Sequence, residues 1–194
     1  GHNAGTDGQR NLYANNLKIE TDPTTIPQYV DLYVKGQVEL NTNLEVENLI
    51  IEANQFLQIN PGVNLTVNGA LINENTASKS QSGLLIKSNA TGTGSLIHNT
   101  ADVPATVERY FAGTEQWRLV SSPVVNQAVS GEWTPAGTYQ PDNTGYDFYA
   151  YDEPTYTWLN QKVGANYITQ FVPGKGYLVS FEATDQTKIG RAHV

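Results

Sequence analysis

Residues 49–67 read LIIEANQFLQINPGVNLTV. The triplets at 49–51, 57–59 and 65–67 each place two apolar side chains two residues apart, and they begin eight residues apart. Alternation with a period of two is typical of β-strands that bury one face. The segments between the triplets contain Asn, Pro and Gly, which favour tight corners. A fixed repeat of short strands and corners predicts a β-solenoid, that is, a parallel β-helix or β-roll.

The same pattern continues on both sides of this run. Further apolar pairs occur at 32/34, 38/40, 44/46, 84/86 and 96/97. An antiparallel meander of short hairpins is the alternative that the pattern leaves open. The regular spacing favours the sides of a solenoid turn, because hairpins usually vary more in strand length. We therefore expect residues 1–100 to form a β-solenoid or roll repeat region.

The second half of the chain has a different composition. Residues 101–194 contain all three Trp, eight of the 11 Tyr and four of the five Phe. Aromatic and β-branched runs separated by Pro, Gly and Asn predict short strands. The candidate strands are 106–111, 117–121, 146–151, 157–160, 167–171 and 176–181. The expected fold class is all-β, a short β-solenoid followed by an aromatic-rich β-sandwich at residues 101–194, with the boundary near 99–104.

Charge and composition exclude several classes of protein. Lys and Arg number 11 against 19 Asp and Glu, a formal net charge of −8. We expect no nucleic-acid partner, because binding to phosphates needs a positive surface. No apolar run approaches the roughly 20 residues of a membrane helix, so we expect no membrane insertion. The absence of Cys excludes disulfides, thiolate metal sites and a cysteine nucleophile.

Several runs occur together in a characteristic order. They are residues 48–69, 92–97, 105–110, 117–124 and 173–179. In this order they resemble the non-catalytic β-roll plus β-sandwich module of large secreted Bacteroidetes proteins, which lies upstream of a type IX secretion sorting domain. The resemblance covers residues 44–181 and implies a secreted or cell-surface location, with neighbouring domains of a longer parent chain as partners. Such modules occur beside polysaccharide-degrading enzymes, peptidases and adhesins and usually carry no catalytic residues.

Sequence patterns for catalysis are weak. His2 and His193 lie at the termini, and nothing in the sequence pairs His98 with Ser121 or Ser122, as a hydrolytic triad requires. A small β-helix polysaccharide hydrolase or lyase is a weaker hypothesis, because such enzymes normally have more turns than this region supplies. We expect no enzyme activity and no catalytic residues.

Acidic residues gather around a turn in the second half. Asp142, Asn143, Asp147 and Asp152 are candidate Ca²⁺ ligands, because oxygen ligands spaced along a loop suit this ion. The alternative, which the composition favours, is that they are turn formers. A catalytic carboxylate pair is the least favoured interpretation. Calcium is the only cofactor that the sequence indicates.

A dense aromatic cluster is the most informative feature. The candidate ligand-binding residues are Trp133, Tyr139, Tyr149, Tyr151, Tyr156 and Trp158. Sugars stack their C–H faces on flat rings, whereas the alternative is packing in a sandwich core. Alternation predicts that Phe148 lies in the core and that Tyr149 and Tyr151 face away from it. Trp117 lies within an apolar strand and is expected in the core, whereas Trp133 and Trp158 lie beside turns and are expected to be exposed.

These observations lead to two hypotheses. The first is a carbohydrate-binding accessory module of a multidomain secreted protein, with polysaccharide as its ligand. The second is a structural spacer or adhesin segment without a small-molecule ligand, which the solenoid repeat favours.

Overall fold

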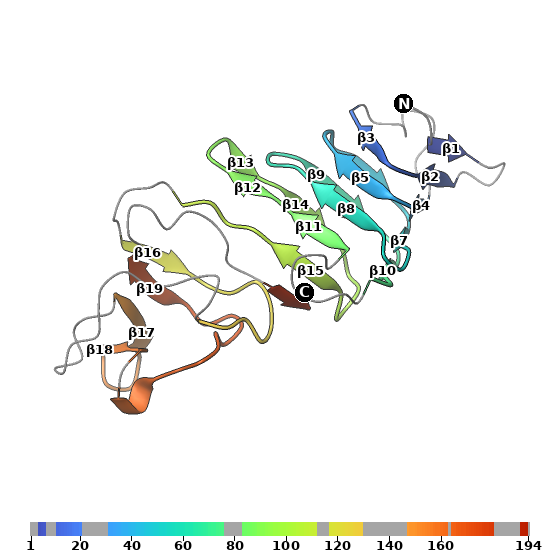
Figure 1. Cartoon of the computed structure of the whole chain (residues 1–194). Coiled ribbons are helices and arrows are strands. Elements are labelled where there is room, and N and C mark those ends of the chain that lie inside the picture. The colour runs from blue at the N-terminus through green and yellow to red at the C-terminus, as the bar shows by residue number, and fades with distance from the viewer. Residues whose placement is uncertain are drawn as a thin grey trace. The chain divides into compact units, whose positions relative to one another are not determined.

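The computed structural model describes residues 4–6, 11–20, 31–75, 83–111, 117–129, 147–162, 164–180 and 191–193. Within these ranges the chain is all-β, and its helical content is one 3₁₀ turn, Gly164–Asn166. The predicted fold class is confirmed. The chain divides into a first unit, Gly1–Arg109 with Ala192–Val194, and a second unit, Tyr110–Arg191. Figure 1 shows the strands of both units.

The first unit is a four-turn β-solenoid over residues 12–107, and each turn has up to three sides. Side A contains β2 (Leu12–Ala14), β4 (Leu32–Val34), β7 (Leu49–Ile51) and β10 (Leu71–Asn73), with β1 (Ala4–Thr6) antiparallel to β2. Side B contains β3 (Leu17–Ile19), β5 (Gln37–Leu40), β8 (Phe56–Ile59), β11 (Leu84–Ile86), β15 (Pro104–Val107) and β20 (Arg191–His193). Side C contains β6 (Leu44–Val46), β9 (Asn64–Val67) and β14 (Ser95–Ile97), and a hairpin of β12 (Ser88–Asn89) and β13 (Gly92–Thr93) precedes β14.

The eight-residue repeat has a direct structural origin. Strands β7, β8 and β9 are the three sides of one turn, and Leu49, Leu57 and Leu65 begin the corresponding triplets. Each of these strands pairs in parallel with the strand one turn away, for example Leu57 with Val38 and with Leu84. Parallel pairing on all three sides confirms the solenoid and excludes the antiparallel meander.

The solenoid core is built from columns of aliphatic side chains. Leu32, Leu49 and Leu71 stack in register on side A, and the first two are fully buried. The columns on sides B and C point toward the same interior and complete the cluster. Each fully buried aliphatic side chain contributes about 1.5–3 kcal/mol. Stability is therefore spread along the turns.

Asn side chains at the corners connect successive turns. The Asn48 Oδ1 atom accepts a hydrogen bond from the Ala70 N–H at 2.8 Å, and the Asn48 side-chain amide donates to Asp31 Oδ1 at 2.7 Å. Asn16 Oδ1 accepts from the Gln37 N–H in the same manner, at 2.8 Å. These bonds pair backbone donors that the corners would leave unsatisfied. They explain why Asn recurs between the apolar triplets.

One expected strand belongs to the solenoid and not to the sandwich. The segment predicted at 106–111 forms β15, Pro104–Val107, and it pairs in parallel with β11, with Leu85 opposite Thr106. Its apolar residues Val103 and Ala105 are buried in the solenoid core. The division between the units accordingly follows Arg109.

The second unit contains a four-stranded antiparallel sheet. Its strand order is β16 (Trp117–Val120), β19 (Tyr177–Ser180), β17 (Phe148–Asp152) and β18 (Thr157–Asn160). These are the strands expected at 117–121, 176–181, 146–151 and 157–160. The segment 167–171 forms no strand and contributes only an isolated antiparallel bridge between Gln170 and Ala128.

One face of this sheet packs into an aromatic core. Phe148 and Tyr177 are fully buried, and the Phe171 ring lies 5.6 Å from Phe148 and 5.1 Å from Tyr177. Phe171 and Val129 come from the two segments joined by the bridge, and both belong to the same buried cluster as Phe148 and Tyr177. The Tyr177 hydroxyl accepts a hydrogen bond from the Val172 N–H at 3.1 Å, and burial raises the pKa of Tyr177.

Candidate functional site

The opposite face of the four-stranded sheet carries apolar and aromatic side chains. Because cross-strand neighbours share a face, the register groups Leu119 with Leu178 and Tyr149, and Tyr151 with Trp158. Trp117 lies two residues before Leu119 and shares its face. We call this group the outer face. It consists of Trp117, Leu119, Tyr149, Tyr151, Trp158 and Leu178.

Four of the six side chains of the outer face are exposed, and Tyr149 and Leu178 are half-buried. Trp117 is 52% exposed, Trp158 47% and Tyr151 43%. Leu119 is 75% exposed, in contrast to the fully buried Phe148 on the other face of the sheet. Single exposed apolar residues are ordinary on protein surfaces, but a contiguous group across four strands indicates a binding surface.

The aromatic rings of the outer face form two tilted pairs. The Trp117 and Tyr149 centroids are 5.9 Å apart with an interplanar angle of 54°. The Tyr151 and Trp158 centroids are 5.3 Å apart with an angle of 57°. Tilted rings touch through an edge, so part of each ring face stays uncovered by its partner. These uncovered faces are the surfaces on which a flat apolar ligand face can stack.

The turn between β17 and β18 adds polar groups at the end of this hairpin. The Thr155 hydroxyl donates to the Asp152 carboxylate, and the Thr155 and Thr157 hydroxyl oxygens lie 2.8 Å apart. Tyr156 is 82% exposed and has a positive φ of 55°. The turn therefore presents hydroxyl groups and one exposed phenol beside Tyr151 and Trp158. None of the six side chains of the outer face is charged, so this surface suits an uncharged ligand.

Four of the six predicted ligand-binding residues lie in the described part of the chain. Tyr149, Tyr151 and Trp158 lie on the outer face, and Tyr156 lies on the adjoining turn. Trp133 and Tyr139 lie outside the described residues. Leu119 and Leu178 belong to the face but were not predicted as site residues. Alternation separates them from Arg118 and Val179 but does not by itself show which set faces outward.

The prediction that Trp117 lies in the core is wrong. Its strand places Arg118 and Val120 on the core side, where Val120 packs on the aromatic cluster. The Arg118 guanidinium carbon lies 5.3 Å from the centroid of the Phe111 ring, a cation–π contact at the edge of that core. The contact gives the Arg118 side chain a partner on the core side of the sheet. Because successive strand residues point to opposite faces, Trp117 faces outward.

Two of the four candidate Ca²⁺ ligands, Asp147 and Asp152, lie in the described part of the chain. Asp142 and Asn143 lie outside the described residues. Asp147 and Asp152 are five residues apart along one extended segment, a separation of about 16 Å. A single Ca²⁺ ion binds its oxygen ligands at about 2.3–2.6 Å, so these two carboxylates do not share an ion. The described ranges also contain no group of three or more His, Cys, Asp or Glu residues that could hold a metal.

Ser122 has a structural role in a tight turn. Its hydroxyl is buried, donates to Gln127 Oε1 at 2.6 Å and accepts from the Val124 N–H at 3.2 Å. These bonds order the segment that leads to Val129 and the isolated bridge at Ala128.

In the part of the chain that the structure describes, no helix has the length and apolar character needed to cross a membrane. The architecture implied by the sequence resemblance, a short solenoid followed by a small antiparallel sheet, is present. Comparison with protein-family models, curated proteins and solved structures found no match for this chain.

Proposed function

We propose that this chain is a non-catalytic extracellular module that binds a neutral polysaccharide through the outer face of its second unit. The observation that carries the proposal is the array of Trp117, Tyr149, Tyr151 and Trp158 on one solvent-facing side of the sheet. Sugar rings expose apolar C–H faces that pack on aromatic rings. Polysaccharides therefore match a flat, uncharged aromatic surface.

The dimensions of the face favour a chain of sugars over a single sugar. Trp117 lies on the edge strand β16 and Trp158 on the opposite edge strand β18, with β19 and β17 between them. Three strand spacings correspond to about 14 Å across the sheet. A ligand that contacts both tryptophans must extend over this width. The sequence resemblance to secreted Bacteroidetes modules supports the extracellular or cell-surface location.

The second candidate function is a structural spacer or adhesin segment. It is favoured by the solenoid, whose turns repeat the same parallel pairing on three sides and whose core is continuous. Repeats of this kind form stiff elements that hold neighbouring domains of a longer chain apart. This candidate requires no ligand on the outer face.

Retention on insoluble glycans tests the first candidate. The full chain is incubated with cellulose, xylan, mannan and chitin, and the bound fraction is measured. We expect retention on at least one glycan, and we expect Trp158→Ala and Trp117→Ala each to weaken it about tenfold, because a stacked ring contributes about 1 kcal/mol or more. Trp158→Phe keeps a flat ring and should retain most of the binding.

A matched control is available in the first unit. Tyr13→Ala removes an aromatic side chain from side A and should leave retention unchanged. Circular dichroism of each variant shows whether the fold is intact. A wild-type chain that binds none of the four glycans would favour the spacer, as would outer-face variants that bind as well as wild type.

A further inference from the structure

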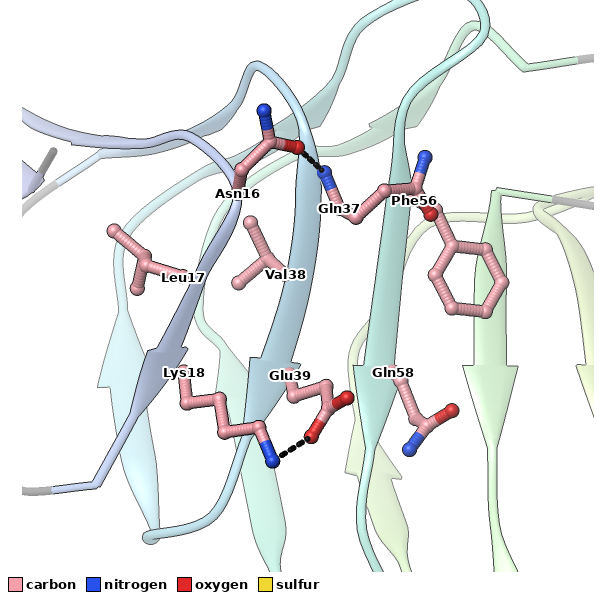
Figure 2. Close-up of a pocket in the computed structure, with 8 residues that line it drawn as sticks. All are labelled: Asn16, Leu17, Lys18, Gln37, Val38, Glu39, Phe56 and Gln58. Atoms are coloured by element: carbon pink, nitrogen blue, oxygen red, sulfur yellow. Dashed lines mark hydrogen bonds and ion pairs between the residues drawn. The ribbon is translucent and has the colours of Figure 1, made fainter. Parts of the chain in front are cut away.

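The first unit carries a hollow of its own. It is formed on the outward side of side B, where β3, β5 and β8 lie next to one another, and has a volume of about 290 Å³ (Figure 2). Its lining residues are Asn16, Leu17, Lys18, Gln37, Val38, Glu39, Phe56 and Gln58. This volume is at the small end of ligand-binding pockets, which suits a ligand of few rings.

The outward side chains of the hollow form two rows across the strands. Gln37 and Phe56 are opposite one another in register, and they continue the row that begins at Asn16. The second row contains Lys18, Glu39 and Gln58. The rows are two residues apart along each strand, about 7 Å. The outward side chains thus surround a floor that includes Leu17 and Val38, with the Phe56 ring at one edge (Figure 2).

Phe56 is an outward-facing aromatic residue in an otherwise polar row. Alternation along β8 buries Leu57 and Ile59 completely and leaves Phe56 and Gln58 on the outside. Phe56 is only half-buried, and its row neighbour on β5 is the amide of Gln37. An apolar ring beside amide groups is the combination that a sugar ring requires, because sugars have one apolar face and a rim of hydroxyls.

The polar groups of the hollow are ordered by their own contacts. The Gln58 amide donates to Asn60 Oδ1 at 2.6 Å, and the Gln37 backbone N–H donates to Asn16 Oδ1 at 2.8 Å. Lys18 Nζ lies 3.2 Å from Glu39 Oε2, with both side chains well exposed. The opposite charges of this pair cancel. The hollow therefore favours an uncharged ligand that both donates and accepts hydrogen bonds.

We propose that this hollow is a second carbohydrate site, which binds a short neutral oligosaccharide with Phe56 as the stacking platform. The amides of Gln37 and Gln58 and the Lys18–Glu39 pair bind the sugar hydroxyls. The site belongs to the solenoid alone and does not depend on the outer face of the second unit. Either site can therefore fail its test without affecting the other.

Nuclear magnetic resonance of the ¹⁵N-labelled full chain tests the proposal. Cellohexaose, xylohexaose and mannohexaose are titrated separately. We expect at least one of them to shift, saturably, the side-chain amide signals of Gln37 and Gln58 and the backbone signals of 37–39 and 56–58. Phe56→Ala should weaken this binding about tenfold. Phe56→Leu keeps an apolar side chain but removes the flat face, so it should weaken binding similarly without risk to the fold.

Two controls distinguish binding at the hollow from binding at the outer face. Trp158→Ala should leave the shifts of the hollow unchanged. Affinity at the hollow should also stay constant between about 50 mM and about 500 mM NaCl, because salt screens only interactions between charges. The proposal is overturned if none of the three oligosaccharides moves the Gln37 and Gln58 signals, or if both Phe56 variants bind as wild type.

Discussion

The outward aromatic rings are arranged differently in the two units. In the solenoid, Tyr13 and Tyr33 lie one turn apart on side A, with centroids 5.1 Å apart and an interplanar angle of 24°. In the second unit, the two pairs are tilted by 54° and 57°. Parallel strands in register place identical side chains next to one another, and the two tyrosine rings stack face to face. Each ring therefore covers part of the other. The antiparallel pairs leave ring faces available to a ligand.

The surroundings of the tyrosine stack support this distinction. Lys35 Nζ lies 5.5 Å from the Tyr13 centroid and 5.9 Å from the Tyr33 centroid, and it forms an ion pair with Glu52 at 2.5 Å. The hydrogen bond that Lys35 Nζ donates to the Glu52 carboxylate raises the pKa of Lys35. The stack and the ion pair connect successive turns of the solenoid. Aromatic content alone therefore does not distinguish the two surfaces, whereas the orientation of the rings does.

The largest expected change in stability comes from comparing substitutions on the two faces of the sheet in the second unit. Phe148→Ala should destabilise this unit by about 3–5 kcal/mol, because it empties a site between Phe171 and Tyr177. Trp117→Ala should cost less than about 1 kcal/mol, although it removes a larger side chain, because Trp117 is half exposed. Denaturant unfolding followed by fluorescence measures both values. A greater loss for Trp117→Ala would show that the outer face is covered in solution.

The same contrast can be made within one turn of the solenoid. Leu57→Ala should destabilise the first unit by about 2–5 kcal/mol, because Leu57 is fully buried between the neighbouring turns. Ile50→Ala, on the outward side of β7, should cost about 1 kcal/mol or less. Thermal unfolding of both variants provides the measurement. Equal losses would contradict the inward and outward assignment of the alternating residues.

A smaller effect is expected at glycines. A Cβ atom at Gly36 would lie 2.4 Å from Asn15 Oδ1 and 2.6 Å from the Asn16 backbone nitrogen, so Gly36→Ala should cost about 1–3 kcal/mol. At Gly176, in the second unit, a Cβ atom would meet nothing within 4 Å. Gly176→Ala should be neutral or stabilise by up to about 1 kcal/mol. The melting temperature should therefore fall for Gly36→Ala and stay unchanged or rise for Gly176→Ala, and a tolerated Gly36→Ala would refute the close packing of this corner.

The smallest expected effect concerns calcium. Asp147 and Asp152 are too far apart to bind one ion together, and Asp152 accepts a hydrogen bond within its own turn. We therefore expect millimolar Ca²⁺ and EDTA to leave the melting temperature of the chain unchanged. An increase with Ca²⁺ would indicate a bound ion by mass action. Asp152→Asn would then show whether this carboxylate contributes.

Much of the solenoid could be predicted from the sequence, because its strands bury one face and therefore alternate. The repeat at 49–51, 57–59 and 65–67 follows from three corners per turn, and Asn and Gly mark those corners. The aromatic character of the second unit and the shared face of Tyr149 and Tyr151 were also predictable. Phe56 was not recognised as a site residue, because a half-buried Phe in an apolar strand resembles core until its neighbours on β5 are known.

Only the tertiary structure decided which of the two alternating sets of residues in a strand faces the core. In β16, Trp117 and Leu119 alternate with Arg118 and Val120, and either pair could have been buried on local grounds. Pairing with β19 places Arg118 opposite Val179 and thereby on the core side. Pairing likewise assigned β15 to the solenoid. Alternation is a local property of the chain, whereas the choice of buried face depends on strands distant in sequence, because cross-strand neighbours must share a face.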